Sequence, residues 1–402
     1  MLKHASAIIS RSSLALSDLR AAVILIVLAF HSSLAYLDSL PAAAPPFNSP
    51  PYRWRAFPMI DSQRWFGFDL FCAPQDVYLM SLMFFLSGVF AWPGLVRTGS
   101  WDFLCHRVLR LGLPFGLTVL LLMPVAHYPV YLITAADASV TAFWESWLAL
   151  PFWPSGPPWF LWQLLVLDIA AAGVHRFIPG SKAFFGKVAS LGARPGRFFA
   201  GLVVASALAY VPLAIAFTPW EWSQLGPFAL QLCRPLHYAV YFFAGLGVGS
   251  CGIENGLLAS DGLLARRWAA WLAAAVAAFL LWITPTALII GLQDAGPLGL
   301  QIIANIGFVL CCASSSFFLL ALFLHFAKNR SRMLDSLSRN AYGMFLIHYV
   351  FVVWLQYALL NAPLFAVAKA AIVFSVTLVL SWAISEALWQ FPLRVWPPGV
   401  KR

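Results

Sequence analysis

Residues Leu19–Ser33 read LRAAVILIVLAFHSS, a run of aliphatic side chains with an arginine near its start and a histidine near its end. A helix needs about 20 predominantly apolar residues to cross a bilayer, and such runs recur along all 402 residues. The chain is 61% hydrophobic and 10% charged, whereas a soluble domain is about 45–50% apolar and about 25% charged. These properties indicate an integral membrane protein without a large soluble domain.

The apolar runs are continuous, whereas the strands of a membrane barrel alternate in polarity. We therefore expect an all-α, polytopic membrane protein of about ten transmembrane helices, forming a single transmembrane domain over residues 1–402. The predicted spans lie near residues 19–38, 76–96, 103–126, 159–177, 199–217, 229–250, 266–288, 298–326, 338–360 and 364–389.

The basic residues predict the orientation, because Lys and Arg beside short loops are retained on the cytoplasmic side. With the N-terminus inside, that side receives every Lys and Arg except Arg53, Arg55, Arg64, Arg234 and Lys369. We therefore expect both termini in the cytoplasm. The net charge of +10 then reflects topology and contact with the anionic headgroups of membrane lipids, and it gives no reason to expect a nucleic acid partner.

A second interpretation of the N-terminus is a secretory signal peptide that ends at Ala42-Ala43-Ala44, an A-x-A-like cleavage site. Its basic region would be unusually long, and its apolar core would contain His31. We therefore expect the first span to belong to the mature protein. The six cysteines form no C-x-x-C pair and show no His/Cys ligand spacing, so we expect neither a disulfide nor a bound metal ion.

Ionisable side chains inside spans are energetically costly, and they tend to face a cavity and to mark functional sites. Arg20 and His31 are eleven residues apart, which in a helix is three turns plus about 20° and a rise of about 16 Å. The two side chains therefore share one helix face, which favours a functional role for His31. The candidates of this kind are Arg20, His31, Arg107, Arg110, Asp168, Arg234, His237, His348, Lys369 and Glu386.

Arg107 and Arg110 lie at i and i+3, and this spacing predicts one shared helix face. Two guanidinium groups bind phosphate through paired hydrogen bonds, as a nucleotide-bearing cofactor from the cytosol would require; the alternative is that both extend to lipid headgroups. Asp168 and Glu386 are the acids deepest in the spans. Each is expected to pair with Lys369 or an arginine, or to belong to a proton relay beside a histidine.

Several other features have two interpretations. Ser87 and Gly88 are small enough for close helix packing, and His348 is either a packed, hydrogen-bonded residue or a second catalytic histidine. The long loop 38–75 is expected to fold over another part of the molecule. Tryptophans near the outer surface form an interfacial belt or stack on a sugar ring; they are Trp54, Trp65, Trp144, Trp147 and Trp153.

The segment SDLRAAVILIVLAFH at residues 17–31 resembles the opening of the acyltransferase-3 family of bacterial integral-membrane acyltransferases, whose first helix places a histidine eleven residues after an arginine. Five later segments resemble further landmarks of the family in the same order: MFFLSGVF, RVLRLGLPF, PPWFLWQLL, YFFAGLGVG and NAYGMFLIHY. The resemblance covers residues from about 16 to 392.

This resemblance implies a multi-pass protein of the bacterial inner membrane that transfers an acyl group from cytoplasmic acyl-CoA, usually acetyl-CoA, to a hydroxyl of a carbohydrate or glycolipid. It assigns Arg20 and His31 as the pair of the first helix, and Arg107 and Arg110 as the pair of the third. Less directly it assigns supporting roles to Ser87, Gly88, Trp159, Tyr342 and His348.

The end of the chain departs from the family, which often carries Glu-x-Pro where this sequence has Gln390-Phe391-Pro392. Glu386 lies one turn earlier, and we consider it a candidate substitute for that carboxylate.

A hydroxyl that attacks a thioester must lose its proton, and histidine, with an unperturbed pKa of about 6.5, is well suited to accept it. We expect His31 to act as this general base, or to carry the acyl group itself. Arg20, Arg107 and Arg110 would hold the phosphates of coenzyme A.

Other functions stay open at this point. One is a proton-coupled transporter or flippase of a glycan or lipid-linked sugar; another is a different type of membrane O-acyltransferase that depends on His348. The sequence gives no indication of the oligomeric state, and it does not distinguish an acetyl from a succinyl donor.

Overall fold

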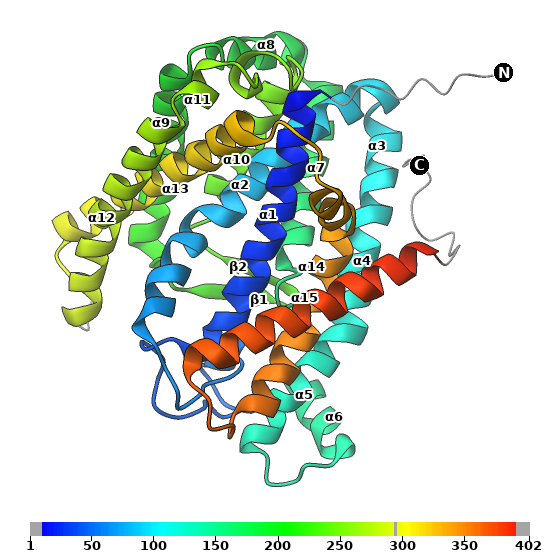
Figure 1. Ribbon diagram of the computed structural model, residues 1–402, viewed down its shortest axis with the longest axis vertical. Helices are drawn as coiled ribbons and strands as arrows, with labels where there is room; N and C mark the ends of the chain where they lie inside the picture. Colours follow the sequence, from blue (N-terminus) through cyan, green and yellow to red (C-terminus); the bar gives the residue numbers. More distant parts are fainter. Residues whose placement is uncertain (1–9, 293–295, 391–402) are drawn as a thin grey trace.

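A computed structural model describes residues 10–292 and 296–390 of the chain. Long helices stand side by side in one bundle, and a short two-stranded hairpin lies among them (Figure 1). Nine helices of the described residues are long and apolar enough to cross a membrane. The expected all-α, polytopic membrane fold is therefore confirmed.

The elements follow one another in a simple order along the chain. The helices are α1 (Arg11–Ser33), α2 (Phe66–Thr98), α3 (Ser100–Arg107), α4 (Leu113–Leu117), α5 (Met123–Thr134), α6 (Val140–Leu148), α7 (Trp159–Phe177), α8 (Ser181–Leu191), α9 (Pro195–Phe217), α10 (Pro235–Gly249), α11 (Leu263–Arg266), α12 (Trp268–Leu292), α13 (Leu298–Phe326), α14 (Arg332–Leu359) and α15 (Ala366–Gln390). The 3-10 helices are η1 (Leu34–Tyr36), η2 (Arg53–Arg55) and η5 (Gly256–Leu258), the π-helical stretches are η3 (Val108–Gly112) and η4 (Thr118–Leu122), and the strands are β1 (Trp222–Leu225) and β2 (Phe228–Gln231).

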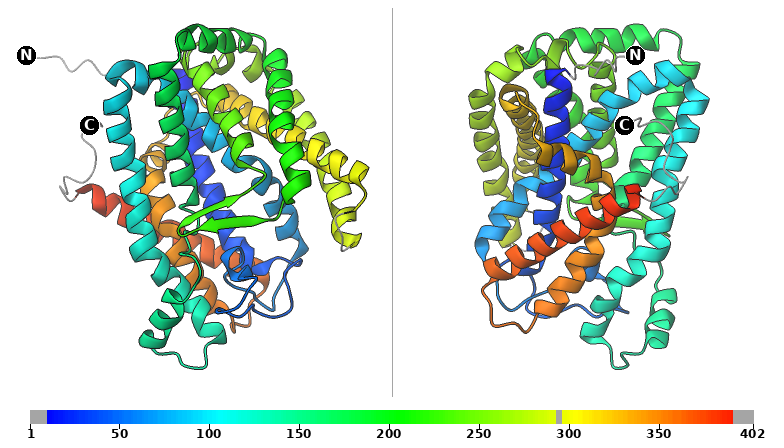
Figure 2. Two further views of the ribbon diagram at one scale, coloured as in Figure 1. Left: turned by 180° about the vertical axis from the view of Figure 1, so that it is seen from behind. Right: turned by 45° about the vertical axis from the view of Figure 1, so that its right-hand side comes forward.

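Helix α1 runs through the centre of the bundle and packs against α2, α13, α14 and α15 (Figure 1). The start of α1 lies near α8 and α11, and we call this end of the bundle the inner end, because the basic residues predict that it faces the cytoplasm. The opposite end, which holds α6 and the loop after α1, is called the outer end. Helix α15 slants across the bundle, as both views in Figure 2 show.

The predicted span at residues 229–250 is only partly helical. Its first residues belong to strand β2, which pairs antiparallel with β1, and helix α10 begins at Pro235, a residue suited to the first turn. Fifteen residues remain for α10, fewer than the about 20 that span a bilayer. The helix packs closely on α2, since a Cβ atom on Gly88 or Gly245 would lie 2.0 Å from a backbone oxygen of the other helix.

The third span, Ser100–Thr134, stays helical although prolines interrupt its hydrogen bonds. Pro129 lacks the N–H group that a regular helix would donate to the carbonyl of Val125, four residues earlier, and the Trp354 indole of α14 donates to that carbonyl at 2.9 Å instead. The Tyr342 hydroxyl of α14 donates to the carbonyl of Arg110, in the π-helical stretch η3 that precedes Pro114.

A third backbone carbonyl of this span also accepts its hydrogen bond from a side chain. In the π-helical stretch η4 the bonds run from i+5 to i, so the carbonyl of Val119 would need an N–H from Pro124, which has none. The indole of Trp153 donates to Val119 at 2.9 Å. Tertiary contacts therefore complete the backbone hydrogen bonds of this span.

We expect Trp153→Phe to lower the free energy of unfolding by about 1–3 kcal/mol, because the buried carbonyl of Val119 loses its donor. The matched variant is Trp271→Phe, which makes the same change at an indole whose Nε1–H has no hydrogen-bond partner in the described chain and which should therefore cost less. Unfolding by SDS in mixed micelles measures both. Equal losses in the two variants would show that ring size, not the carbonyl, determines the effect.

The loop after α1 folds over the outer end of the bundle, as its length predicts. Phe47, Trp54 and Met59 are buried there in an apolar cluster with side chains of α5, α6 and α14. Trp54 and Trp147 are 0% and 1% exposed, so the interfacial-belt interpretation is wrong for these two residues. We call the segment 34–65 together with α5 and α6 the outer cap.

One buried ion pair ties the outer cap to α15. The Lys369 ammonium, 0% exposed, lies 2.7 Å from Oδ2 of Asp61, which is 1% exposed. It also donates to Oδ1 of Asp61 at 3.0 Å and to the carbonyl of Leu360 at 3.1 Å. The partner of Lys369 is therefore an acid of the outer loop, and neither Asp168 nor Glu386.

Candidate functional site

A large cavity of about 1340 Å³ opens in the inner half of the bundle. Its walls come from α1, α2, α7, α14 and the third span. On α1 the lining residues Arg20, Ile24 and Val27 follow each other at helical spacing. On α14 the lining includes Tyr342 and Phe345. We call this space the inner cavity.

The inner cavity is strongly basic. Among the lining residues that the structure describes, the one acidic side chain is Asp335, which forms an ion pair with Arg330 at 3.0 Å. Its cations are Arg20, Arg107, Arg110, Arg330, Arg332 and Arg339. Since guanidinium groups outnumber carboxylates here, the cavity suits an anionic ligand, and phosphate groups match the paired N–H groups of arginine.

Arg20 and the two arginines of the third span line the same cavity but have different neighbours. The guanidinium of Arg20 lies 4.9 Å from the ring centroid of Phe90. Nε of Arg107 lies 3.2 Å from Oδ2 of the fully buried Asp168, so Arg107 is partly neutralised. Arg110 is exposed and lies within η3.

Arg107 and Arg110 border the same cavity, as their i, i+3 spacing predicts. Arg107 forms the ion pair with Asp168 of α7, and the backbone carbonyl of Arg110 accepts a hydrogen bond from Tyr342 of α14. Arg110 itself lies in the π-helical stretch η3.

Two histidines meet within one turn of the lining residues Val27 and Phe345 of the inner cavity. His31 follows Val27 by one turn of α1, and His348 follows Phe345 on α14. Nδ1 of His31 lies 2.9 Å from the carbonyl oxygen of Val27 and 3.3 Å from Nε2 of His348. Nδ1 of His348 lies 2.7 Å from the carbonyl oxygen of Phe345.

These contacts fix the tautomers of the neutral rings. A carbonyl oxygen only accepts hydrogen bonds, so Nδ1 carries the proton in both histidines. Nε2 of His348 is then an acceptor for the Nδ1–H of His31, and Nε2 of His31 keeps its electron pair. Two acceptors on Nδ1–H stabilise the ring when Nε2 takes up a proton, which is the arrangement of a general base.

The remaining predicted residues lie at different distances from this site. Ser87 lines the inner cavity, whereas Gly88 serves the contact with α10. Trp159 is absent from the described lining and instead stacks on Tyr238, with ring centroids 6.0 Å apart. Glu386 accepts a hydrogen bond from Nδ2 of Asn340 at 2.6 Å.

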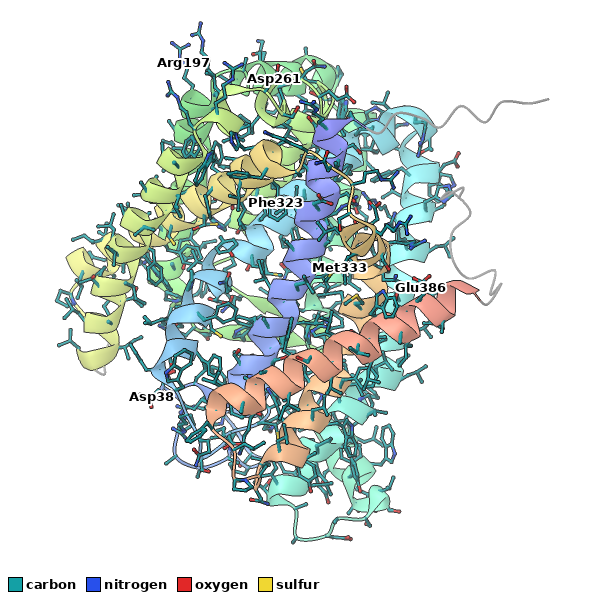
Figure 3. All side chains as sticks on the ribbon, in the orientation of Figure 1. Asp38, Arg197, Asp261, Phe323, Met333 and Glu386 are labelled. Carbon is teal, nitrogen blue, oxygen red and sulfur yellow. The ribbon has the colours of Figure 1, made fainter. Side chains whose placement is uncertain are left out.

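The contact of Glu386 with Asn340 corrects the expectation of a cationic partner for that acid. Glu386 lies near the end of α15 (Figure 3), and it is no part of the described lining of the inner cavity. Phe391 and Pro392, on which the departure from Glu-x-Pro rests, lie outside the described residues. For Asp168 the expectation of an arginine partner is confirmed by its ion pair with Arg107.

His237 and Arg234 have partners of their own, away from the inner cavity. His237 is fully buried and bonds through Nδ1 to the Ser206 hydroxyl at 2.6 Å and through Nε2 to Ser81 at 3.1 Å. Arg234 pairs with Asp76 at 2.6 Å. His237 therefore has the geometry of a packed, hydrogen-bonded core residue.

The sequence interpretation missed His127, which is 1% exposed and hydrogen-bonded through Nδ1 to the Met123 carbonyl at 2.9 Å. Its ring contacts Tyr349, whose ring also contacts His31. The predicted third span, residues 103–126, ends one residue before His127, which therefore falls in the predicted outer loop. A helix extended beyond residue 126, as α5 is, includes it.

Comparison with protein families gave a match. The acyltransferase-3 family model, described as an acyltransferase domain, matches residues 17–386, which is nearly the whole chain. The matched range includes both histidines and every arginine of the inner cavity. Neither the curated proteins nor the solved structures gave a significant match.

Proposed function

The chain belongs to the acyltransferase-3 family and is a membrane acyltransferase; from this premise we propose that its acyl donor is acyl-CoA, and acetyl-CoA in particular. The donor enters the inner cavity from the cytoplasm, and the acceptor is a hydroxyl group of a cell-envelope or extracellular glycan. The membrane is then the bacterial inner membrane, with both termini in the cytoplasm.

One observation carries this proposal: a cavity lined by arginines from three helices ends within one turn of the His31–His348 pair. Between the arginines and the histidines the lining is mostly apolar, with Ile24, Val27 and Phe345, and it includes the hydroxyl groups of Thr118 and Tyr342. A phosphate-bearing head at the arginines would therefore place an uncharged arm and its thioester toward His31, about 16 Å farther along α1.

The chemistry needs one proton acceptor beside the thioester. The acceptor oxygen attacks the thioester carbonyl, its O–H proton moves to Nε2 of His31, and the carbon–sulfur bond breaks. The thiolate of coenzyme A then takes up the proton from His31. Binding both reactants in this geometry contributes to the rate, because aligned groups react as if at very high concentration.

The same nitrogen also permits a two-step route. Nε2 of His31 would attack the thioester first, and the resulting acyl-imidazole would pass the acyl group to the acceptor. Incubation with radiolabelled acetyl-CoA in the absence of acceptor distinguishes the routes. Label that stays on denatured wild-type protein and is absent from His31→Ala supports the acyl carrier; unlabelled protein supports direct transfer.

The proposal is tested with purified protein in lipid nanodiscs. Acetyl-CoA and an envelope glycan extract are added together, and free coenzyme A is measured with a thiol reagent. We expect thiol release that requires both additions. If neither acetyl-CoA nor succinyl-CoA is consumed while labelled glycan crosses proteoliposome membranes, the proposed reaction is wrong.

Arg110→Gln should weaken acetyl-CoA binding by about 10- to 150-fold, because loss of one charge-assisted phosphate contact costs about 1.5–3 kcal/mol. Arg197→Gln is the matched control: it removes the same charge from the same end of the bundle (Figure 3), at a residue that is exposed and outside the described lining. Equilibrium binding in nanodiscs measures both variants. Equal affinities would remove Arg110 from donor binding.

A further inference from the structure

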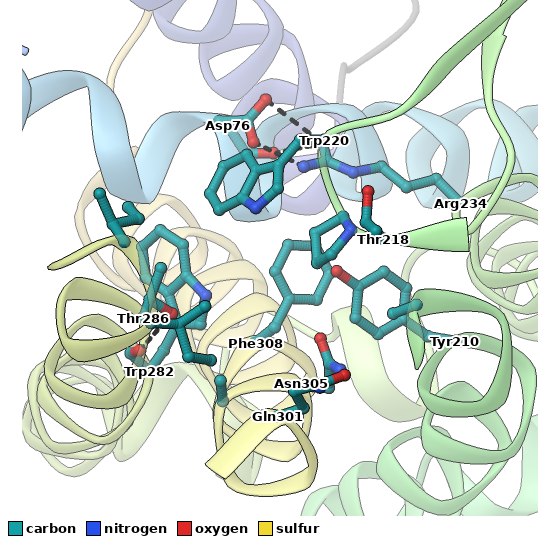
Figure 4. Close-up of a pocket in the computed structure, with 15 residues that line it drawn as sticks. Asp76, Tyr210, Thr218, Trp220, Arg234, Trp282, Thr286, Gln301, Asn305 and Phe308 are labelled. Atoms are coloured by element: carbon teal, nitrogen blue, oxygen red, sulfur yellow. Dashed lines mark hydrogen bonds and ion pairs between the residues drawn. The ribbon is translucent and has the colours of Figure 1, made fainter. Parts of the chain in front are cut away.

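A second cavity, of about 350 Å³, lies in the outer half of the bundle (Figure 4). Its lining comes from the outer parts of α2, α9, α12 and α13, from the segment after α9, and from Arg234 before α10. None of its described lining residues also lines the inner cavity. We call it the outer cavity; its volume is at the lower end of the about 300–1,000 Å³ of small-molecule sites.

The polar groups of the outer cavity are fixed in place. Arg234, 4% exposed, donates to both carboxylate oxygens of Asp76, at 2.6 and 3.3 Å, and to its backbone carbonyl at 3.0 Å. The carboxylate itself remains 47% exposed and borders the cavity. Figure 4 shows this pair at one side of the space.

A buried amide adds to this polar set. Asn305 is 5% exposed, and within the described chain its side chain has no hydrogen-bond partner. It lines the cavity together with Gln301, whose Nε2 is already committed to the Gly296 carbonyl at 2.9 Å. Because Asn305 lines the cavity, its side-chain amide can donate to and accept from the hydroxyls of a bound ligand.

Aromatic rings form much of the remaining wall. Trp220, Trp282, Phe308 and Tyr210 surround the space (Figure 4). The faces of such rings carry partial negative charge and attract the weakly positive C–H groups of a sugar ring. A wall of aromatic rings with a few fixed polar groups is the composition of a binding site for a small, partly apolar ring.

The charges of the two cavities differ. Of the described lining residues of the outer cavity, Asp76 and Arg234 are the ionisable acid and base, and they neutralise each other. The outer cavity therefore favours an uncharged ligand, whereas the inner cavity favours an anion. A quaternary ammonium group would also suit aromatic rings, but the guanidinium of Arg234, 5.2 Å from the Phe308 centroid, opposes a second cation.

The two cavities border the same face of helix α2. Asp76, Met80, Met83 and Ser87 follow each other at i, i+4, i+7 and i+11 of α2, so they lie on one face. The last three line the inner cavity, and Asp76 lines the outer one. A ligand bound at Asp76 therefore lies at the outer end of the helix face that borders the donor cavity.

We propose that the outer cavity binds a neutral sugar ring of the acceptor, with the carboxylate of Asp76 accepting from its hydroxyls and Asn305 completing the hydrogen bonds. This inference rests on the proposed function for its role in the reaction, although binding itself can be tested without turnover. It assigns the acceptor to a class, uncharged cyclic saccharides, and excludes anionic glycans at this position.

The test uses the full chain in nanodiscs and ligand-observed NMR with the methyl glycosides of glucose, galactose, mannose and N-acetylglucosamine. We expect at least one glycoside to bind, with affinity reduced tenfold or more in Asn305→Leu and in Trp282→Ala. The control is Trp268→Ala, on the same helix α12 but outside the described lining. Choline is the competing cationic probe.

The outcomes separate this inference from the proposed function. Loss of glycoside binding in the two cavity variants, with acetyl-CoA binding intact, supports the outer cavity. This result supports the sugar site even if no coenzyme A is released. In that case the proposed acyl-CoA-dependent reaction is wrong, but the sugar site is still supported. Failure of all four glycosides to bind, equal binding in the variants, or tighter binding of choline overturns the sugar site.

Discussion

Replacing His31 with alanine is expected to reduce the rate of acyl transfer by about 10²- to 10⁴-fold, which is the contribution of a positioned general base. The reason is geometric: the Nδ1–H of His31 is held by the carbonyl of Val27 and by Nε2 of His348, which leaves Nε2 as the site that accepts a proton. Alanine provides no replacement in the apolar surroundings. Coenzyme A release in nanodiscs measures the loss.

The variants of His348 show whether the pair acts as one unit. His348→Gln can keep an acceptor beside Nδ1–H of His31, whereas His348→Leu removes it, so glutamine should retain more activity than leucine. Acetyl-CoA binding should be unchanged in all three variants, because neither histidine lines the described inner cavity. Full activity in His31→Ala would exclude this residue from the reaction.

Lys369→Met is expected to lower the free energy of unfolding by about 3–5 kcal/mol, because it leaves the buried carboxylate of Asp61 without its cation. The double variant Asp61→Asn with Lys369→Met should recover part of the loss, since no unpaired charge remains. Unfolding by SDS in mixed micelles provides the measurement.

The control for this effect is the pair of Arg330 and Asp335 at the inner end, whose side chains are 62% and 29% exposed. Removing its charge with Asp335→Asn should change stability by at most about 1 kcal/mol. If Lys369→Met is as mild as this control, the buried pair does not hold the outer cap against α15. A large loss that the double variant restores supports the pair as a structural tie.

The helices of the bundle could be predicted because hydropathy and length alone identify a span. The predicted bounds 159–177 and 298–326 coincide with α7 and α13. The predicted start of the span 229–250 was wrong, because an apolar run does not reveal whether its first residues belong to a helix or, as here, form a hairpin strand. A membrane span is defined by composition, whereas a strand pair is defined by its partner.

The candidate site could be predicted only where its residues share one helix. The spacing of Arg20 and His31 predicted a common face, and Arg20 lines the cavity that ends one turn before His31. The contacts of His31 with His348, and of Asp61 with Lys369, join residues more than 300 positions apart. No local pattern encodes such pairs, so the structure was needed to find them.

The hydrogen bonds that side chains of α14 donate to the backbone of the third span have a consequence for biogenesis. The carbonyls of Arg110 and Val125 receive their donors from residues 232 and 229 positions later, which the ribosome has not yet synthesised when this span enters the translocon. Until α14 arrives, the carbonyl oxygen of Val125, which Pro129 leaves without a backbone donor, has to be hydrated or shielded by another protein. Truncation before Tyr342 should therefore leave the third span accessible to water-soluble labelling reagents or bound to an insertion chaperone.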